Sequence, residues 1–148
     1  MHRSFSVSLL LLVFAAIAVL LLSACGPIGP TWVDAGATFT TKGLSAEYAK
    51  ASLGDLAKTS TADTAKLRHD ALVGLRRRGG SAAVAADLIT KTLPTDGHGV
   101  PLYVEHATVN GVPSLILIEA IGPPSGKLTT KRLWALSDQG AVLFVGTR

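Results

Sequence analysis

Apolar positions along this chain fall into regions of different spacing. Residues 7–22 form an apolar run that is interrupted only by Ser8. Between residues 60 and 93 apolar positions recur every third or fourth residue, which predicts amphipathic helices. From residue 99 onward they alternate along the chain, which predicts β-strands. Residues 25–58 keep no sustained period and are punctuated by Gly and Pro.

The first predicted helix begins at Ser60 and ends before Gly79. Ser60 offers a hydroxyl cap, and Asp63 follows three residues later, a pattern typical of helix starts. Three arginines occupy its last turn, where cations suit the negative end of the helix dipole. A second, shorter helix is predicted to begin with a Ser81 cap and to end before Pro94. The apolar positions are Leu67, Ala71, Leu72 and Leu75 in the first helix and Val84, Ala85, Leu88 and Ile89 in the second.

Two β-hairpins are predicted after the helices. Asn110-Gly111 favours a two-residue type I′ turn, because both residues accept positive φ angles. A second turn is predicted at residues 137–140, with Gly140 at a bulge. The expected cross-strand pairs are His106 with Leu115, Val104 with Leu117, Tyr103 with Ile118, Trp134 with Phe144, and Leu136 with Val142. Trp134, Leu136, Val142 and Phe144 would then share one face, which is our candidate surface for a partner.

These elements predict an α+β fold, with two helices packed on a four-stranded antiparallel sheet. We expect residues 59–148 to form the domain and residues 25–58 to form a flexible tether. Two local patterns interrupt the tether. Trp32, Val33 and Phe39 could form a short strand or dock on the domain, and Ser45 could cap a helix that carries Leu44 and Tyr48.

Both faces of the predicted sheet carry apolar side chains, whereas two short helices can cover only one face. The second face could be covered by residues 31–58 folding back, by a second copy of the domain, or by another protein. We expect an intermolecular partner, because Gly and Pro make residues 31–58 a poor packing element.

The apolar run ends in Leu22-Ser23-Ala24-Cys25, and Arg3 gives it a cationic start. Its length is at the short limit for a membrane-spanning helix, which needs about 20 apolar residues. The stretch resembles the lipobox of bacterial lipoprotein precursors. The resemblance implies that residues 1–24 are a cleaved signal peptide and that Cys25 carries a diacylglycerol and an N-acyl chain. The protein would then be anchored on the outer face of the bacterial cell membrane.

The order of helix, helix and four strands also resembles a known layout. It is similar to small envelope interaction domains of the beta-lactamase-inhibitor-protein and outer-membrane-assembly lipoprotein type. Their glycine-rich helix-hairpin motif is absent from this sequence, so the resemblance implies a fold and not a partner.

Composition adds three constraints. Arg3 is the only charge lost with residues 1–24, which leaves 13 of the 14 basic residues against 10 acidic ones. That mild excess does not indicate nucleic-acid binding. Cys25 is the only cysteine, so its lipidation would leave no disulfide and the apolar core must hold the fold. The abundance of Ala, Gly, Val and Arg is typical of a GC-rich bacterial genome, such as that of an actinobacterium.

The sequence offers no pattern for catalysis or metal binding, and we expect neither a metal nor any cofactor beyond the lipid. Residues 125–127 lack the first glycine and the hydroxyl residue of a phosphate-binding loop. No G-x-S-x-G motif is present. Glu105 and Glu119 are predicted on opposite faces of the sheet, which argues against a carboxylate pair. His69, His98 and His106 show no metal-ligand spacing.

Two functions fit these features, and neither is enzymatic. The first is a membrane-anchored binding or structural module that contacts an envelope protein or a second copy of itself. The alternative is a carrier or sensor of a small apolar ligand held between the helices and the sheet. An apolar pocket with few polar groups would favour the carrier, whereas a filled core with an exposed apolar face would favour the module.

Overall fold

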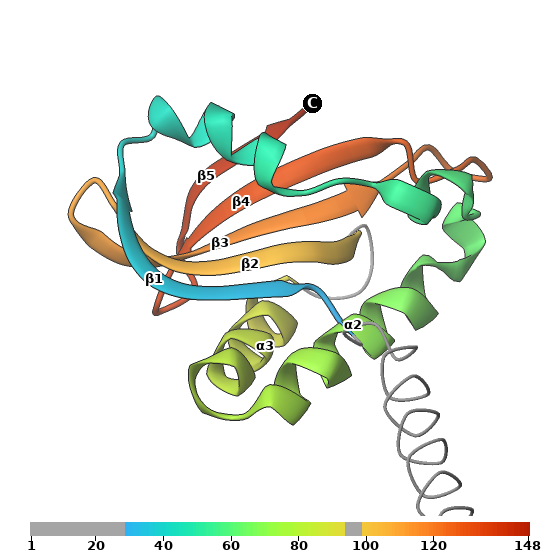
Figure 1. Ribbon diagram of the computed structural model, residues 1–148. Helices are drawn as coiled ribbons and strands as arrows, with labels where there is room; N and C mark the ends of the chain where they lie inside the picture. Colours follow the sequence, from blue (N-terminus) through green and yellow to red (C-terminus); the bar gives the residue numbers. More distant parts are fainter. Residues whose placement is uncertain (1–28, 94–98) are drawn as a thin grey trace, which may run out of the picture.

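The computed structural model describes residues 29–93 and 99–148, which fold into a sheet with helical layers on both sides (Figure 1). The strands are β1 Thr31–Phe39, β2 Val100–Val109, β3 Val112–Ile121, β4 Thr130–Ser137 and β5 Val142–Thr147. The α-helices are α2 Thr64–Arg78 and α3 Gly80–Thr92. Three 3₁₀ helices precede them: η1 Gly43–Lys50, η2 Gly54–Lys58 and η3 Thr61–Asp63.

The described strands form one sheet in the order β1-β2-β3-β4-β5. β1 runs parallel to β2, and the other neighbours are antiparallel. The predicted α+β class is confirmed, and β2–β5 form the expected antiparallel hairpins. The prediction of only four strands is wrong, because β1 adds a fifth along β2. The prediction of a tether is also wrong from residue 31 onward, since this segment pairs with a strand about 70 residues away in sequence.

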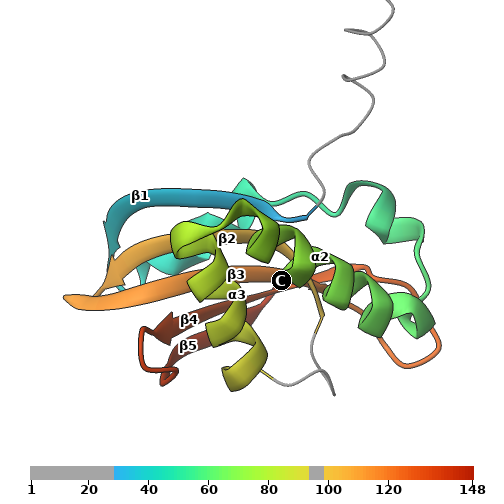
Figure 2. The same cartoon turned by 90° about the horizontal axis from the view of Figure 1, so that it is seen from below.

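The helices α2 and α3 cover one face of the sheet, as Figure 2 shows. The residues buried between them and the sheet are Leu72, Leu75, Ala82, Ala85, Ala86, Ile89, Leu93, Val104, Leu115, Leu117 and Leu136. This layer matches the predicted helix-on-sheet packing, and burial of its aliphatic side chains is the main force that holds the helices in place.

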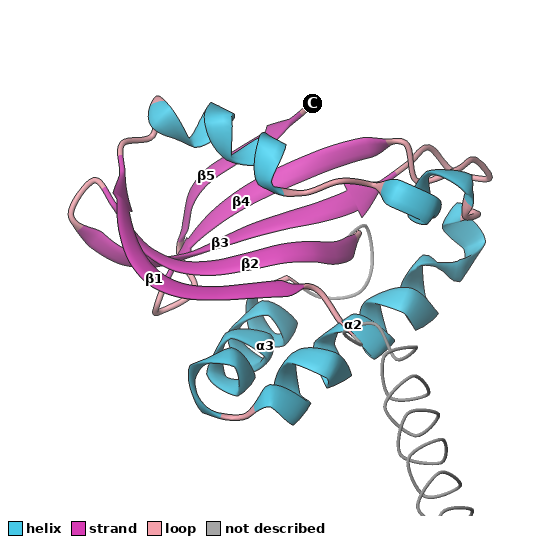
Figure 3. Cartoon of the chain, viewed as in Figure 1, coloured by secondary structure: helices cyan, strands magenta, loops and turns pink. Residues whose placement is uncertain are grey.

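Residues of η1 cover the opposite face (Figure 3). The residues buried there are Leu44, Tyr48, Ala51, Tyr103, Ala107, Val109, Ile116, Ile118, Leu133 and Ala135. The expectation that an intermolecular partner covers this face is therefore wrong. The segment folds back because Leu44 and Tyr48 of η1 are almost completely buried against this face of the sheet.

The Asn110-Gly111 turn has φ angles of 49° and 81°, and the register of β2 with β3 is the predicted one. The second hairpin differs. Leu136 pairs with Val142 as expected, but Trp134 pairs with Val145, and Phe144 pairs with Ala135. A register shift between Ala135 and Leu136 moves the strand by one residue, which turns its side chains to the other face.

Ser60 is a cap as predicted, because its hydroxyl accepts a hydrogen bond from the Ala62 amide, 3.2 Å away, but it caps the 3₁₀ helix η3; α2 itself begins at Thr64, with Asp63 as its N-cap. Gly79 ends α2 with a φ of 71° and is also the N-cap of α3. The predicted Ser81 cap is wrong. Ser81 lies in the first turn of α3, and its hydroxyl donates to Asp34 Oδ2 at 2.7 Å.

The predicted lipobox, Leu22, Ser23, Ala24 and Cys25, lies outside the described residues. Among the helices of residues 29–93 and 99–148, none is long and apolar enough to cross a membrane.

Candidate functional site

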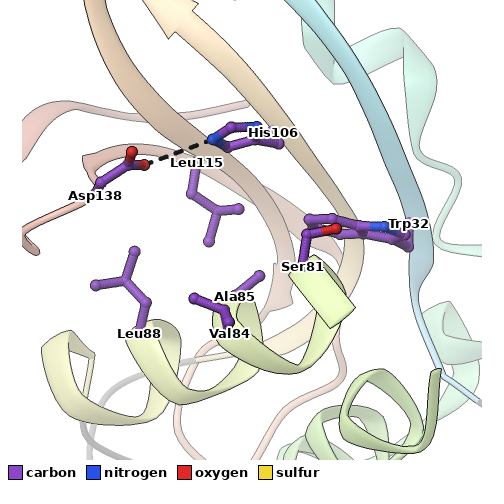
Figure 4. A pocket seen from close by; sticks show the side chains of 8 residues that line it. All are labelled: Trp32, Ser81, Val84, Ala85, Leu88, His106, Leu115 and Asp138. Carbon is purple, nitrogen blue, oxygen red and sulfur yellow. Dashed lines mark ion pairs between the residues drawn. The ribbon is translucent and has the colours of Figure 1, made fainter. Parts of the chain in front are cut away.

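A pocket of about 270 Å³ opens between α3 and the helix-covered face of the sheet (Figure 4). It is lined by Trp32, Ser81, Val84, Ala85, Leu88, His106, Leu115 and Asp138. Five of these eight side chains are apolar, and the three polar ones lie toward its rim. Ligand sites in proteins are mostly apolar, have a few placed polar groups, and start at about 300 Å³, so this pocket suits a small molecule.

The spacing of residues on α3 builds one wall of the pocket. Ser81, Val84, Ala85 and Leu88 lie on one face of the helix, at the three- and four-residue intervals that align along its axis. Ala85 is buried, whereas Val84 is 70% exposed. Val84 therefore presents an aliphatic side chain at the mouth, although the sequence pattern placed it in the core.

Neighbouring strands supply the side of the pocket opposite α3. His106 and Leu115 are paired across β2 and β3. Trp32 of β1 pairs with Val104 and so lies on the same face as His106, two residues further along β2. A parallel pairing between strands so distant in sequence brings Trp32 here. No local pattern in the sequence indicates that Trp32 lines a pocket.

The turn between β4 and β5 brings Asp138 to the rim. Gly140 in this turn has a φ of 88°, and a Cβ atom there would lie 2.6 Å from Thr92 Oγ1 at the end of α3. Only glycine allows both that backbone conformation and so close an approach to the helix. The turn is thereby packed against α3, and Asp138 faces the pocket (Figure 4).

A histidine lies between two carboxylates at the rim. His106 Nδ1 is 3.6 Å from Asp34 Oδ1, and His106 Nε2 is 3.7 Å from Asp138 Oδ1. These distances are too long for hydrogen bonds, and all three side chains are about half exposed. The contacts are therefore weak, and the carboxylates retain the capacity to bind another partner.

The residues predicted to form a partner face do not lie together. Trp134 and Leu136 pack into the layer beneath the α-helices, whereas Phe144 packs on the opposite side with η1. Val142 is half exposed. The register shift in β4 and β5 separates these side chains, so they form no common surface.

Glu105 and Glu119 lie on opposite faces of the sheet, as predicted, and both are buried. Glu119 accepts hydrogen bonds from the side chains of Arg132 and Trp134, at 2.6 and 2.7 Å, and from the Gly99 amide at 2.9 Å. Arg68 of α2 lies 3.4 Å from the same carboxylate and donates to the Leu93 and Gly99 carbonyls. Burial lowers the pKa of Arg68, an effect that Glu119 opposes.

On the other face, Glu105 accepts hydrogen bonds from Lys50 Nζ at 2.9 Å and from the Tyr103 hydroxyl at 2.8 Å. Burial alone would lower the pKa of Lys50, but hydrogen bonds and charges from Glu47 and Glu105 raise it above its ordinary value. Both glutamates are buried and well supplied with donors, so they stabilise the packing of the layers. The sequence did not predict these cation partners, which come from distant segments.

Metal binding has no geometric support in the residues that the structure describes, where no group of three or more His, Cys, Asp or Glu side chains could hold an ion.

Comparisons with known proteins add no relative: no family model, no curated protein and no solved structure matches this chain. The function is therefore argued from the site alone.

Proposed function

We propose that this protein is a lipid-anchored binding protein on the outer face of the bacterial cell membrane. Its ligand would be a small apolar molecule held between α3 and the sheet. The observation that supports this function is the pocket walled by Trp32, Leu88 and Leu115, with Val84 exposed at its mouth. We propose binding without catalysis.

The anchor is proposed from the Leu22-Ser23-Ala24-Cys25 stretch, and it limits where the pocket can lie. Trp32 is seven residues after Cys25. An extended chain spans at most about 3.3–3.6 Å per residue, so the pocket would lie within about 25 Å of the lipidated cysteine. The pocket would therefore be held close to the bilayer, where apolar molecules concentrate.

A titration of the lipidated protein in nanodiscs tests the proposal. Hexanol should shift the indole N–H resonance of Trp32 saturably, while the indole of Trp134, which is bonded to Glu119, should serve as an internal reference. Val84→Trp should fill the mouth and weaken hexanol binding at least about tenfold, because Val84 is exposed and the larger side chain can be accommodated without unfolding.

The matched control is Val145→Trp, which adds the same ring at an exposed position of β5 outside the pocket lining. This variant should bind hexanol as the wild type does. Absence of a saturable shift at Trp32 in the wild type would overturn the proposed function.

A second candidate, the structural or interaction module, is favoured by β5. This strand ends the sheet, and its residues Val142, Leu143 and Val145 are 50%, 37% and 49% exposed. An edge strand with apolar side chains can pair with the same strand of a second copy. Concentration-dependent dimerisation in analytical ultracentrifugation, abolished by Val145→Lys, would support this module; a monomer at all concentrations would exclude pairing through β5.

A further inference from the structure

The rim of the pocket carries negative charge. Asp138 lines the pocket, and Asp34 lies behind His106, on the other side of its ring. None of the eight lining side chains is a lysine or arginine. The two carboxylates favour a cation at the mouth and oppose an anion.

The aromatic ring of Trp32 and the carboxylate of Asp138 line different parts of the pocket. Figure 4 shows Trp32 and Asp138 on opposite sides of His106, with Leu115 between them and with Ala85 and Leu88 below them on α3. A molecule lying along this line would contact an aromatic ring at one end, aliphatic side chains in the middle and a carboxylate at the other end. These are the contacts that an aliphatic amine can make.

The Asp138 carboxylate is available for such a ligand. Its Oδ1 atom is 3.7 Å from His106 Nε2, which is longer than a hydrogen bond, and its side chain is about half exposed. A protonated amine at hydrogen-bond distance would make a stronger contact with Asp138 than the imidazole does. Asp34, in contrast, already accepts a hydrogen bond from Ser81.

We propose that the ligand is a small organic amine, with its ammonium group on Asp138 and its apolar body directed toward Trp32. This inference rests on the proposed function and names the chemical class of its ligand. The position close to the membrane fits the same class, because cationic amphiphiles partition into bilayers that carry anionic lipids.

The experiment compares hexylamine, hexanol and hexanoate, which share one apolar body, by the Trp32 indole shift of the lipidated protein in nanodiscs. The comparison is made at about pH 8, where an alkylamine is protonated. Hexylamine should bind about three- to tenfold more tightly than hexanol, as expected for one ion pair at a partly exposed rim. Hexanoate should bind more weakly than hexanol.

The decisive comparison is between variants, because partition into the nanodisc is the same for each. Asp138→Asn should reduce hexylamine affinity to that of hexanol and leave hexanol unchanged, since Asn preserves the turn. Asp87→Asn is the matched control: it removes the same charge from α3, where Asp87 pairs with Arg76 rather than lining the pocket. This control should keep the preference for the amine.

The outcomes separate the two proposals. If hexanol binds but the ratio of amine to alcohol affinity is the same in the wild type and in Asp138→Asn, the amine inference is wrong and the apolar binding site remains. If none of the three probes shifts Trp32 saturably, both proposals are wrong.

Discussion

Glu105 and Glu119 are buried on opposite faces of one sheet, and each meets a cation from the layer that covers its face. Lys50 of η1 reaches Glu105, and Arg68 of α2 reaches Glu119. A buried carboxylate without such partners would be strongly unfavourable. The two pairs therefore favour the native position of each covering layer over other packings of the same apolar surfaces.

Arg68→Met should lower the free energy of unfolding by about 3 kcal/mol, as measured by urea denaturation. Arg68 is 1% exposed, and its loss would leave Glu119 with less compensation and the Leu93 and Gly99 carbonyls without their donor. Lys66→Met, on the exposed side of the same helix, is the control and should change stability little. Equal effects from the two variants would contradict a structural role for the Arg68–Glu119 pair.

Stability should fall at alkaline pH because of the cluster around Glu105. Burial, then the hydrogen bond and charge of Glu105, raises the pKa of Tyr103 to about 12. A tyrosine in the unfolded chain ionises near pH 10, so between about pH 10 and 12 the unfolded chain releases a proton that the folded chain keeps. Unfolding is thereby favoured as the pH rises, by up to about 3 kcal/mol. The raised pKa of Lys50 acts in the same direction.

The test is chemical denaturation of the wild type and Tyr103→Phe across this pH range. The variant should lose less stability, because phenylalanine has no proton to release, while the contribution of Tyr48, whose pKa burial also raises, is the same in both proteins. Parallel pH profiles for the two proteins would show that Tyr103 does not titrate as proposed.

The sequence predicted the elements that depend on neighbouring residues. The Asn110-Gly111 turn sets its own backbone geometry, and Ser60 caps the 3₁₀ helix η3, which leads directly into α2. The pairing of β1 with β2 depends on residues far apart in the chain, so no local period reveals it. The same holds for the pocket, whose wall and rim come from β1, α3 and the turn that carries Asp138. The shift between Ala135 and Leu136 could not be predicted because residues 142–145 are all apolar, so either register places an apolar residue opposite Trp134.

Leu44→Ala should reveal how much the segment before α2 contributes to the fold. Leu44 is fully buried against the sheet face that the α-helices leave open. Removing a buried leucine costs about 2–5 kcal/mol through lost burial and the remaining cavity. Val84→Ala is the control, because an exposed valine should contribute less than about 0.5 kcal/mol. A Leu44→Ala protein with the melting temperature of the wild type would mean that residues 43–50 act as a tether after all.

Cys25→Ser tests the proposed anchor. Without the thiol no thioether to diacylglycerol can form, so the precursor should keep residues 1–24, run at higher mass and take up no labelled fatty acid. Ser23→Ala is the matched control, since it keeps a small residue before the cysteine and should be processed and labelled normally.

The anchored protein should also stay with membranes through alkaline washing. One acyl chain binds a membrane only marginally, but each further buried methylene adds about 0.8 kcal/mol, so two or three chains should hold the protein there. Mass spectrometry of the wild-type protein decides the matter: a mature chain without lipid on Cys25 would remove the anchor, and with it the reason to place the pocket beside the bilayer.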